Sequence, residues 1–84
     1  MLKLKEETEV SDYQRYLFAC RRCPEAVILV GCGNHFKTFE KDAVLVGQKL
    51  GRKSVIIDGQ RTLCLSKTTA NALLHTIGHP VKFA

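Results

Sequence analysis

The sequence lacks any apolar run long enough to cross a membrane. Its longest uninterrupted apolar stretch is Ala26–Val30, whereas a membrane-spanning helix needs about 20 such residues. The segment Met1–Glu7 is charged where a secretory signal would have its apolar core. These absences predict a cytoplasmic protein with no membrane partner. In that compartment the four cysteines favour free thiols over disulfides.

Acidic residues are scarce in the second part of the chain. Residues 1–51 carry eight basic and seven acidic side chains, a net charge of +1. Residues 52–84 carry five basic side chains and one acidic side chain, a net charge of +4. Such an excess favours an anionic partner, most commonly nucleic acid, although a basic surface can also serve solubility alone. Paired carboxylates are missing there, and no Ser or Cys stands beside a clear base, so we expect no enzymatic activity.

The cysteines raise the question of a metal site. Cys20, Cys23, Cys32 and Cys64 supply enough thiolates for one zinc ion. Structural zinc sites usually bring their ligands as two close pairs, whereas Cys32 and Cys64 stand far apart in the sequence. We therefore expect buried or partly exposed thiols, with no metal and no cofactor.

Several segments carry the i, i+3, i+4 apolar spacing of amphipathic helices. Ser11 opens a capping box, which predicts a first helix over Asp12–Arg22. A second helix is predicted over Phe39–Leu50. The third is predicted to be capped by Thr68 and to bury Leu74 on the face that packs inward.

Short β-branched segments alternate with these helices and predict strands. The predicted strands are Ala26–Val30, His35–Thr38, Val55–Ile57, Leu63–Leu65 and Val81–Ala84. Asp58-Gly59 predicts a type I′ hairpin turn. Residues 1–10 lack periodicity, so we expect a flexible arm before a single domain over residues 11–84. The element order predicts an α/β fold, a small mixed sheet of about five strands flanked by about three helices.

An ordered set of motifs runs through the chain. Its members are Arg15-Tyr16-Leu17, Pro24, Val27–Val30, Gly33–Phe39, Lys41-Asp42-Ala43 and Ala72–Val81. Together they resemble the N-terminal mismatch-recognition domain of the MutS family of DNA mismatch-repair proteins. In that family a Gln-Tyr-Leu-like helix precedes a Pro and an apolar strand, and Gly-Asp-Phe-Tyr-Glu-Leu-Phe leads into a helix that opens Asp-Asp-Ala. The resemblance covers residues 11–84 and implies the MutS N-terminal domain fold.

The resemblance also implies a way of contacting DNA. In the family the Phe of Gly-Asp-Phe-Tyr-Glu enters the minor groove as a wedge, and the Glu two residues later bonds the mispaired base. Here His35 stands at the Phe position and Lys37 at the Glu position, so both mismatch-reading residues are altered. Imidazole can stack, and lysine meets phosphate more readily than a base. By this resemblance the residues that would contact the DNA groove are His35, Phe36 and Lys37. Side chains alternate between the two faces of a strand, however, so Phe36 is expected to pack inward.

The basic side chains Arg52, Lys53, Arg61 and Lys67 would hold phosphates. The prediction is a non-catalytic duplex DNA-binding module, with double-stranded DNA, mismatched or matched, and further mismatch-repair domains or proteins as partners. No phosphate loop of the Gly-x-x-x-x-Gly-Lys-Ser/Thr type occurs, which excludes ATP hydrolysis by that route. The alternative is a protein-interaction module that kept the fold and lost DNA contact. An exposed apolar patch or an open sheet edge, such as Val81–Ala84, would favour that alternative.

Overall fold

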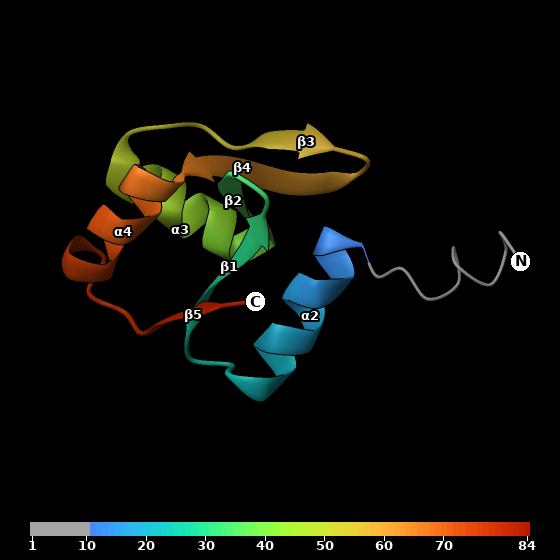
Figure 1. Ribbon diagram of the computed structural model, residues 1–84. Coiled ribbons are helices and arrows are strands. Elements are labelled where there is room, and N and C mark those ends of the chain that lie inside the picture. Colours follow the sequence, from blue (N-terminus) through green and yellow to red (C-terminus); the bar gives the residue numbers. More distant parts are fainter. Residues whose placement is uncertain (1–10) are drawn as a thin grey trace, which may run out of the picture.

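A five-stranded mixed sheet flanked by three helices forms the fold, which confirms the predicted α/β class (Figure 1). The computed structural model describes residues 11–84, so the predicted arm of residues 1–10 lies outside the described residues. The elements are α2 (Asp12–Arg22), β1 (Val27–Cys32), β2 (His35–Phe39), α3 (Glu40–Leu50), β3 (Val55–Ile57), β4 (Gln60–Ser66), α4 (Lys67–Thr76) and β5 (Val81–Phe83). Over residues 11–84, no helix has the length and apolar character to cross a membrane.

The strands lie in the order β3-β4-β2-β1-β5. All neighbouring pairs are antiparallel except β1 and β5, which are parallel. Register places Val30 opposite Lys37 across β1 and β2, and His35 opposite Ser66 across β2 and β4. The two edges of the sheet are therefore β3 and β5.

Strand β1 is apolar on both sides because helices cover both faces of the sheet there. Val27 and Leu29 belong to a core cluster with residues of α3 and α4. Ile28 and Val30 belong to a second cluster with Tyr16 of α2. Figure 1 shows α2 on the opposite side of β1 from α3 and α4. The unbroken apolar run of the sequence thus corresponds to the shared centre of two cores.

The capping box predicted for the first helix is present. The Ser11 hydroxyl accepts from the Gln14 backbone N–H at 3.1 Å, and the Gln14 side chain accepts from the Ser11 N–H at 3.2 Å. Helix α2 has the predicted bounds. Helix α3 begins at Glu40 instead of Phe39, because Phe39 has extended backbone (φ −134°) and its side chain packs into the cluster beside Tyr16.

Two predictions for α4 were wrong. The helix is capped by Ser66, whose hydroxyl accepts from the Thr69 N–H at 3.1 Å, and Thr68 lies inside the helix. Ser66 also ends β4, so the strand passes into the helix with no intervening loop. Leu74 is exposed, because only the narrow stripe of Ala70, Leu73 and Ile77 packs on the sheet.

Both tight turns owe their geometry to residues with positive φ. Asp58 (φ 53°) and Gly59 (φ 80°) join β3 to β4, which confirms the predicted type I′ turn. Gly33 (φ 70°) precedes Asn34 in the turn between β1 and β2. Positive φ at the first central residue alone is the pattern of a type II′ turn, for which glycine is preferred. The β1–β2 hairpin therefore has a tight, narrow tip.

Candidate nucleic-acid interface

The tip of the β1–β2 hairpin is open to solvent. Gly33 and Asn34 are exposed, and His35 at the base of the turn is half-buried. Cys32 pairs with His35 and closes the hairpin. The hairpin tip, which the resemblance predicts to contact DNA, is therefore accessible to solvent.

Strand alternation separates the three residues that follow this tip. His35 and Lys37 lie on the α2 side of β2, because Lys37 pairs with Val30 of the α2-side cluster. Phe36 lies on the opposite side, packed against the core beneath α3 and α4. Its ring centroid is 5.1 Å from that of Phe83. Phe36 thus packs inward, as alternation predicts, and supports the hairpin from behind.

Lys37 is held by a carboxylate. Its Nζ lies 3.3 Å from Oδ2 of Asp12, which also accepts from the Cys32 thiol at 3.2 Å. The hydrogen bond to Asp12 raises the pKa of Lys37. Burial acts to raise the pKa of Asp12, but the hydrogen bonds from Cys32 and Lys37 and the charges of Lys37 and Arg15 outweigh it and lower that pKa. Lys37 is therefore a charged side chain whose field at the tip is partly neutralised.

Further cations flank the tip on both sides. His35 pairs with Ser66 at the end of β4, and the next residue is the exposed Lys67 of α4. On the α2 side, Arg15 donates from Nη1 to the Gly31 carbonyl at 3.1 Å. The tip is thus bordered by Lys67, Lys37 and Arg15. Arg15 was not among the predicted site residues.

The other predicted phosphate-binding residues lie elsewhere. Arg52, Lys53 and Arg61 line a groove of about 440 Å³ between α3 and the start of β3. Arg61 donates to the Ser54 hydroxyl at 3.1 Å and stands on the same strand face as Leu63, in the core beneath α3. The sheet therefore separates these side chains from His35 and Lys37. The predicted site is divided between two surfaces.

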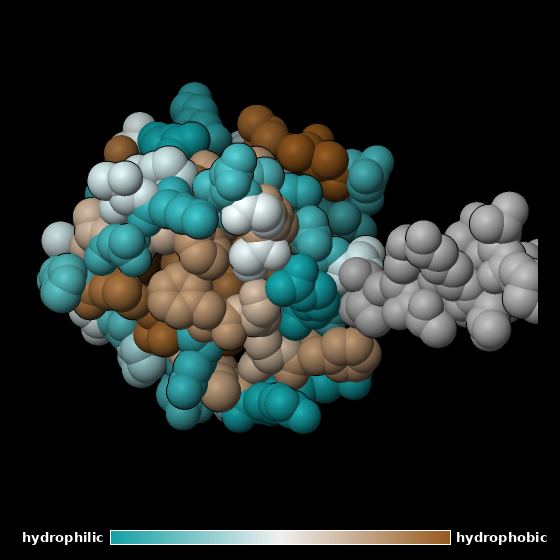
Figure 2. All heavy atoms as spheres, viewed as in Figure 1, coloured by the Kyte–Doolittle hydropathy of each residue, from teal (hydrophilic) through white to brown (hydrophobic). Residues whose placement is uncertain are grey.

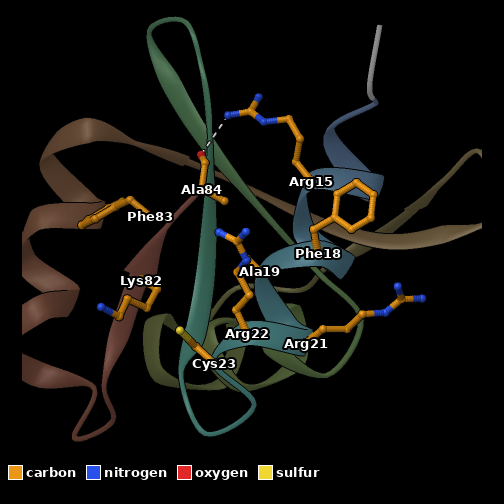
Figure 3. Close-up of a pocket in the computed structure, with 9 residues that line it drawn as sticks. All are labelled: Arg15, Phe18, Ala19, Arg21, Arg22, Cys23, Lys82, Phe83 and Ala84. Carbon is orange, nitrogen blue, oxygen red and sulfur yellow. Dashed lines mark hydrogen bonds between the residues drawn. The ribbon is translucent and has the colours of Figure 1, made fainter. Parts of the chain in front are cut away.

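A third basic surface lies between α2 and β5 and was not predicted from the sequence. This groove of about 620 Å³ is lined by Arg15, Phe18, Ala19, Arg21, Arg22, Cys23, Lys82, Phe83 and Ala84 (Figure 3). Arg15 connects it to the hairpin, because its Nη2 donates to the Ala84 carbonyl at 2.9 Å. The spacing of Arg15, Phe18 and Arg22 along one helix flank was a sequence signal for it. Lys82 lies far from these residues in the sequence, so only the folded chain brings it to the groove.

The cysteines show no metal-binding geometry in the part of the chain that the structure describes. No group of three or more His, Cys, Asp or Glu side chains there could hold a metal ion. All four cysteines are free thiols. Burial and the hydrogen bond to Asp12 raise the pKa of Cys32 to about 11, so it acts as a protonated donor and not as a nucleophile.

Comparison of the sequence with protein-family models and with curated proteins gave no match.

Proposed function

We propose that this domain binds duplex DNA through the β1–β2 hairpin, as a non-catalytic module related to the mismatch-recognition domain of the MutS family. One observation carries the proposal. The narrow tip at Gly33 and Asn34 is exposed, and the cations Arg15, Lys37 and Lys67 border it. A tip of this kind can rest on the rims of a minor groove about 6 Å wide, where its cations meet phosphates and a single side chain enters the groove.

In this proposal His35 is the side chain that enters the base stack as a wedge. A side chain inserted between base steps costs least where pairing is already defective, which is the source of mismatch preference. Imidazole offers less stacking area than a phenyl ring, and Lys37 cannot accept a hydrogen bond from a base. We therefore expect general duplex affinity with a small preference for mismatches. The proposed setting is the cytoplasm, with further mismatch-repair domains or proteins as partners.

The test is fluorescence anisotropy with matched and mismatched labelled duplexes at two salt concentrations. Lys67→Ala should weaken binding to both duplexes and reduce the slope of log K against log salt by about 0.9. His35→Ala should reduce the difference between the duplexes. Lys49→Ala removes an exposed cation of α3 that lines none of the grooves and should change nothing. Salt-independent binding, or no binding at low salt, would overturn the proposal.

The alternative, a protein-interaction module, is favoured by a different observation. Edge strand β3 leaves Val55 56%, Ile56 59% and Ile57 44% exposed. Figure 2 shows apolar side chains gathered on the surface over β3. The sequence placed the open edge at Val81–Ala84, and β5 is indeed the other edge strand. Three consecutive exposed apolar side chains lie at β3, however, whereas the only exposed apolar side chain of β5 is Phe83. Sedimentation of the wild type as a monomer at every concentration would count against this second candidate.

A further inference from the structure

We infer that the groove between α2 and β5 binds an extended acidic peptide, which adds as a further strand to the open edge of β5. This inference rests on the second candidate function, since it names the partner class of a protein-interaction module, and it does not depend on DNA binding. Three features carry it: the free backbone groups of β5, the position of α2 beside that edge, and the charge of the groove.

The first feature is a set of backbone groups that are free to bond to another strand. The Pro80 carbonyl accepts a hydrogen bond from β1 at 2.8 Å, and the Ala84 N–H donates one to β1 at 2.9 Å. Successive residues of a strand direct their N–H and C=O groups to opposite sides. The backbone groups of Val81 and Phe83 therefore point away from β1, toward the edge of the sheet.

The second feature is helix α2, which forms a wall beside this edge. Arg15 ties the two elements together, because its Nη2 donates to the Ala84 carbonyl at 2.9 Å (Figure 3). The space between them is a groove of about 620 Å³, lined on the strand side by residues 82–84. A strand added to β5 would run along this groove and direct every second side chain toward α2. Sheet edges recognise extended peptides in this way, through main-chain bonds and contacts to alternate side chains.

The third feature is the charge of the groove. Among residues 11–84, no acidic residue lines it, and the cations that do are Arg15, Arg21, Arg22 and Lys82. Lys82 pairs with Ile28 of the α2-side cluster, so its side chain lies on the face of the sheet that α2 covers. In the same part of the chain Arg21, Arg22 and Lys82 have no ion-pair partner. The two walls of one groove thus both supply unpaired cations.

These features together specify the partner. Acidic side chains at every second position of an added strand would meet Arg22 and Lys82. The side chains between them would lie on the other face of the sheet, where Phe83 is 48% exposed and apolar residues would cover it. A single-stranded nucleic acid would also meet the cations, but its sugar-phosphate backbone has no N–H donors for the carbonyls of Val81 and Phe83. The ligand is therefore a segment of alternating acidic and apolar residues.

The test is fluorescence anisotropy of the whole chain with a labelled peptide of alternating Glu and Val, about eight residues long. The wild type should bind this peptide at low salt, and should bind a Lys-Val peptide of the same length far more weakly. Methylating the backbone nitrogens of either the Glu or the Val residues should weaken binding about tenfold, and methylating the other set should not, because only one set faces β5.

Charge reversal in the groove tests the same contacts from the protein side. Arg22→Glu should weaken binding of the Glu-Val peptide about fivefold and strengthen binding of the Lys-Val peptide. Lys82→Glu, on the other wall, should act in the same way and replaces the first variant if that one fails to fold. Lys49→Glu reverses an exposed cation of α3 outside the groove and should leave both affinities unchanged.

Three results would overturn the inference. The first is no binding of the Glu-Val peptide at low salt, and the second is equal binding of the Glu-Val and Lys-Val peptides. The third is tighter binding of a single-stranded dT oligonucleotide that Arg22→Glu weakens, since the groove would then be a nucleic-acid site.

Failure of peptide binding is separable from failure of the proposed functions. Lys67 does not line this groove, so Lys67→Ala should weaken binding to duplex DNA and leave the peptide affinity unchanged. The apolar patch of β3 lies at the opposite edge of the sheet. Sedimentation of the chain without peptide therefore reports self-association through that patch independently of the groove.

Discussion

The hydroxyl of Tyr16 donates a 3.0 Å hydrogen bond to Oδ2 of Asp42, and both side chains are buried. The same oxygen accepts from the backbone N–H of Ile28 at 3.1 Å. One carboxylate therefore ties α2, β1 and α3 together. Asp42 is also one of the residues that carry the resemblance to the MutS family. In this chain its contacts join three elements of the fold, so we expect Asp42 to act on stability.

Removing this carboxylate should destabilise the domain strongly. Asp42→Ala leaves the Tyr16 hydroxyl and the Ile28 N–H buried without an acceptor, which should cost about 3 kcal/mol in the free energy of unfolding. Tyr16→Phe removes only one donor and should cost about 1 kcal/mol. Urea denaturation followed by circular dichroism measures both. Equal stability of Asp42→Ala and the wild type would contradict the role given to the carboxylate.

Stability should fall at alkaline pH, partly because of Tyr16. Burial, with the neighbouring Cys20 and Asp42, raises the pKa of Tyr16 above its usual value of 10.0. The unfolded chain loses this proton above about pH 10 while the folded chain keeps it. The free energy of unfolding therefore decreases as pH rises, by up to about 1.4 kcal/mol per pH unit. Tyr16→Phe should show a shallower decrease in denaturation experiments between neutral and alkaline pH.

The Cys32 thiol should resist ionisation. Burial and the bond to Asp12 raise its pKa from 9.0 to about 11. The stability that this thiol contributes is present below about pH 9 and lost as pH rises through 11. A variant with Cys20, Cys23 and Cys64 changed to Ala leaves Cys32 as the only thiol. The pH dependence of its alkylation rate reports the pKa directly, and a midpoint at or below 9 would be inconsistent with the observed contacts.

Helix α3 should not tolerate a side chain at Gly47. A Cβ at this position would lie 2.6 Å from the backbone carbonyl oxygen of Arg52. Alanine normally favours a helix over glycine by about 1 kcal/mol, but the clash is with backbone and forces a shift. We expect Gly47→Ala to destabilise the domain by about 1–3 kcal/mol. Urea denaturation compares this variant with the wild type, and equal stability of the two would contradict the close approach of the Arg52 carbonyl.

Asp12 should restrain DNA binding by pairing with Lys37. Asp12→Asn removes the negative charge beside the tip and frees the lysine for a phosphate. Affinity for any duplex should rise severalfold at low salt, and the salt slope should steepen by about 0.9. Anisotropy titrations of the variant and the wild type give both quantities. Unchanged affinity, in a variant that remains folded, would mean that Lys37 does not meet the duplex.

Local signals in the sequence predicted the elements well. The capping box at Ser11 and the Asp58-Gly59 turn were confirmed because each depends on a few neighbouring residues. The cap of α4 was misplaced because Ser66 and Thr68 both offer a hydroxyl near the same helix start. Strand β4 ends at Ser66 and the helix begins at the next residue, which makes Ser66 the capping residue. The exposure of Leu74 likewise depends on how α4 rests on the sheet.

The candidate site was harder to predict than the fold. Period-two alternation was enough to place Phe36 inward. The pairing of Lys37 with Asp12 joins residues far apart in the sequence. The division of the basic residues between surfaces depends on which face of the sheet each element covers. Arg15 was missed for the same reason, since its bonds to Gly31 and Ala84 form only in the folded chain.

The most direct test of hairpin binding to DNA is the perturbation of backbone amide resonances as a duplex is added at low salt. We expect the resonances of Gly33, Asn34, His35 and Lys67 to shift first and most. Shifts confined to the groove of Arg52, Lys53 and Arg61, or no shifts at all, would contradict it.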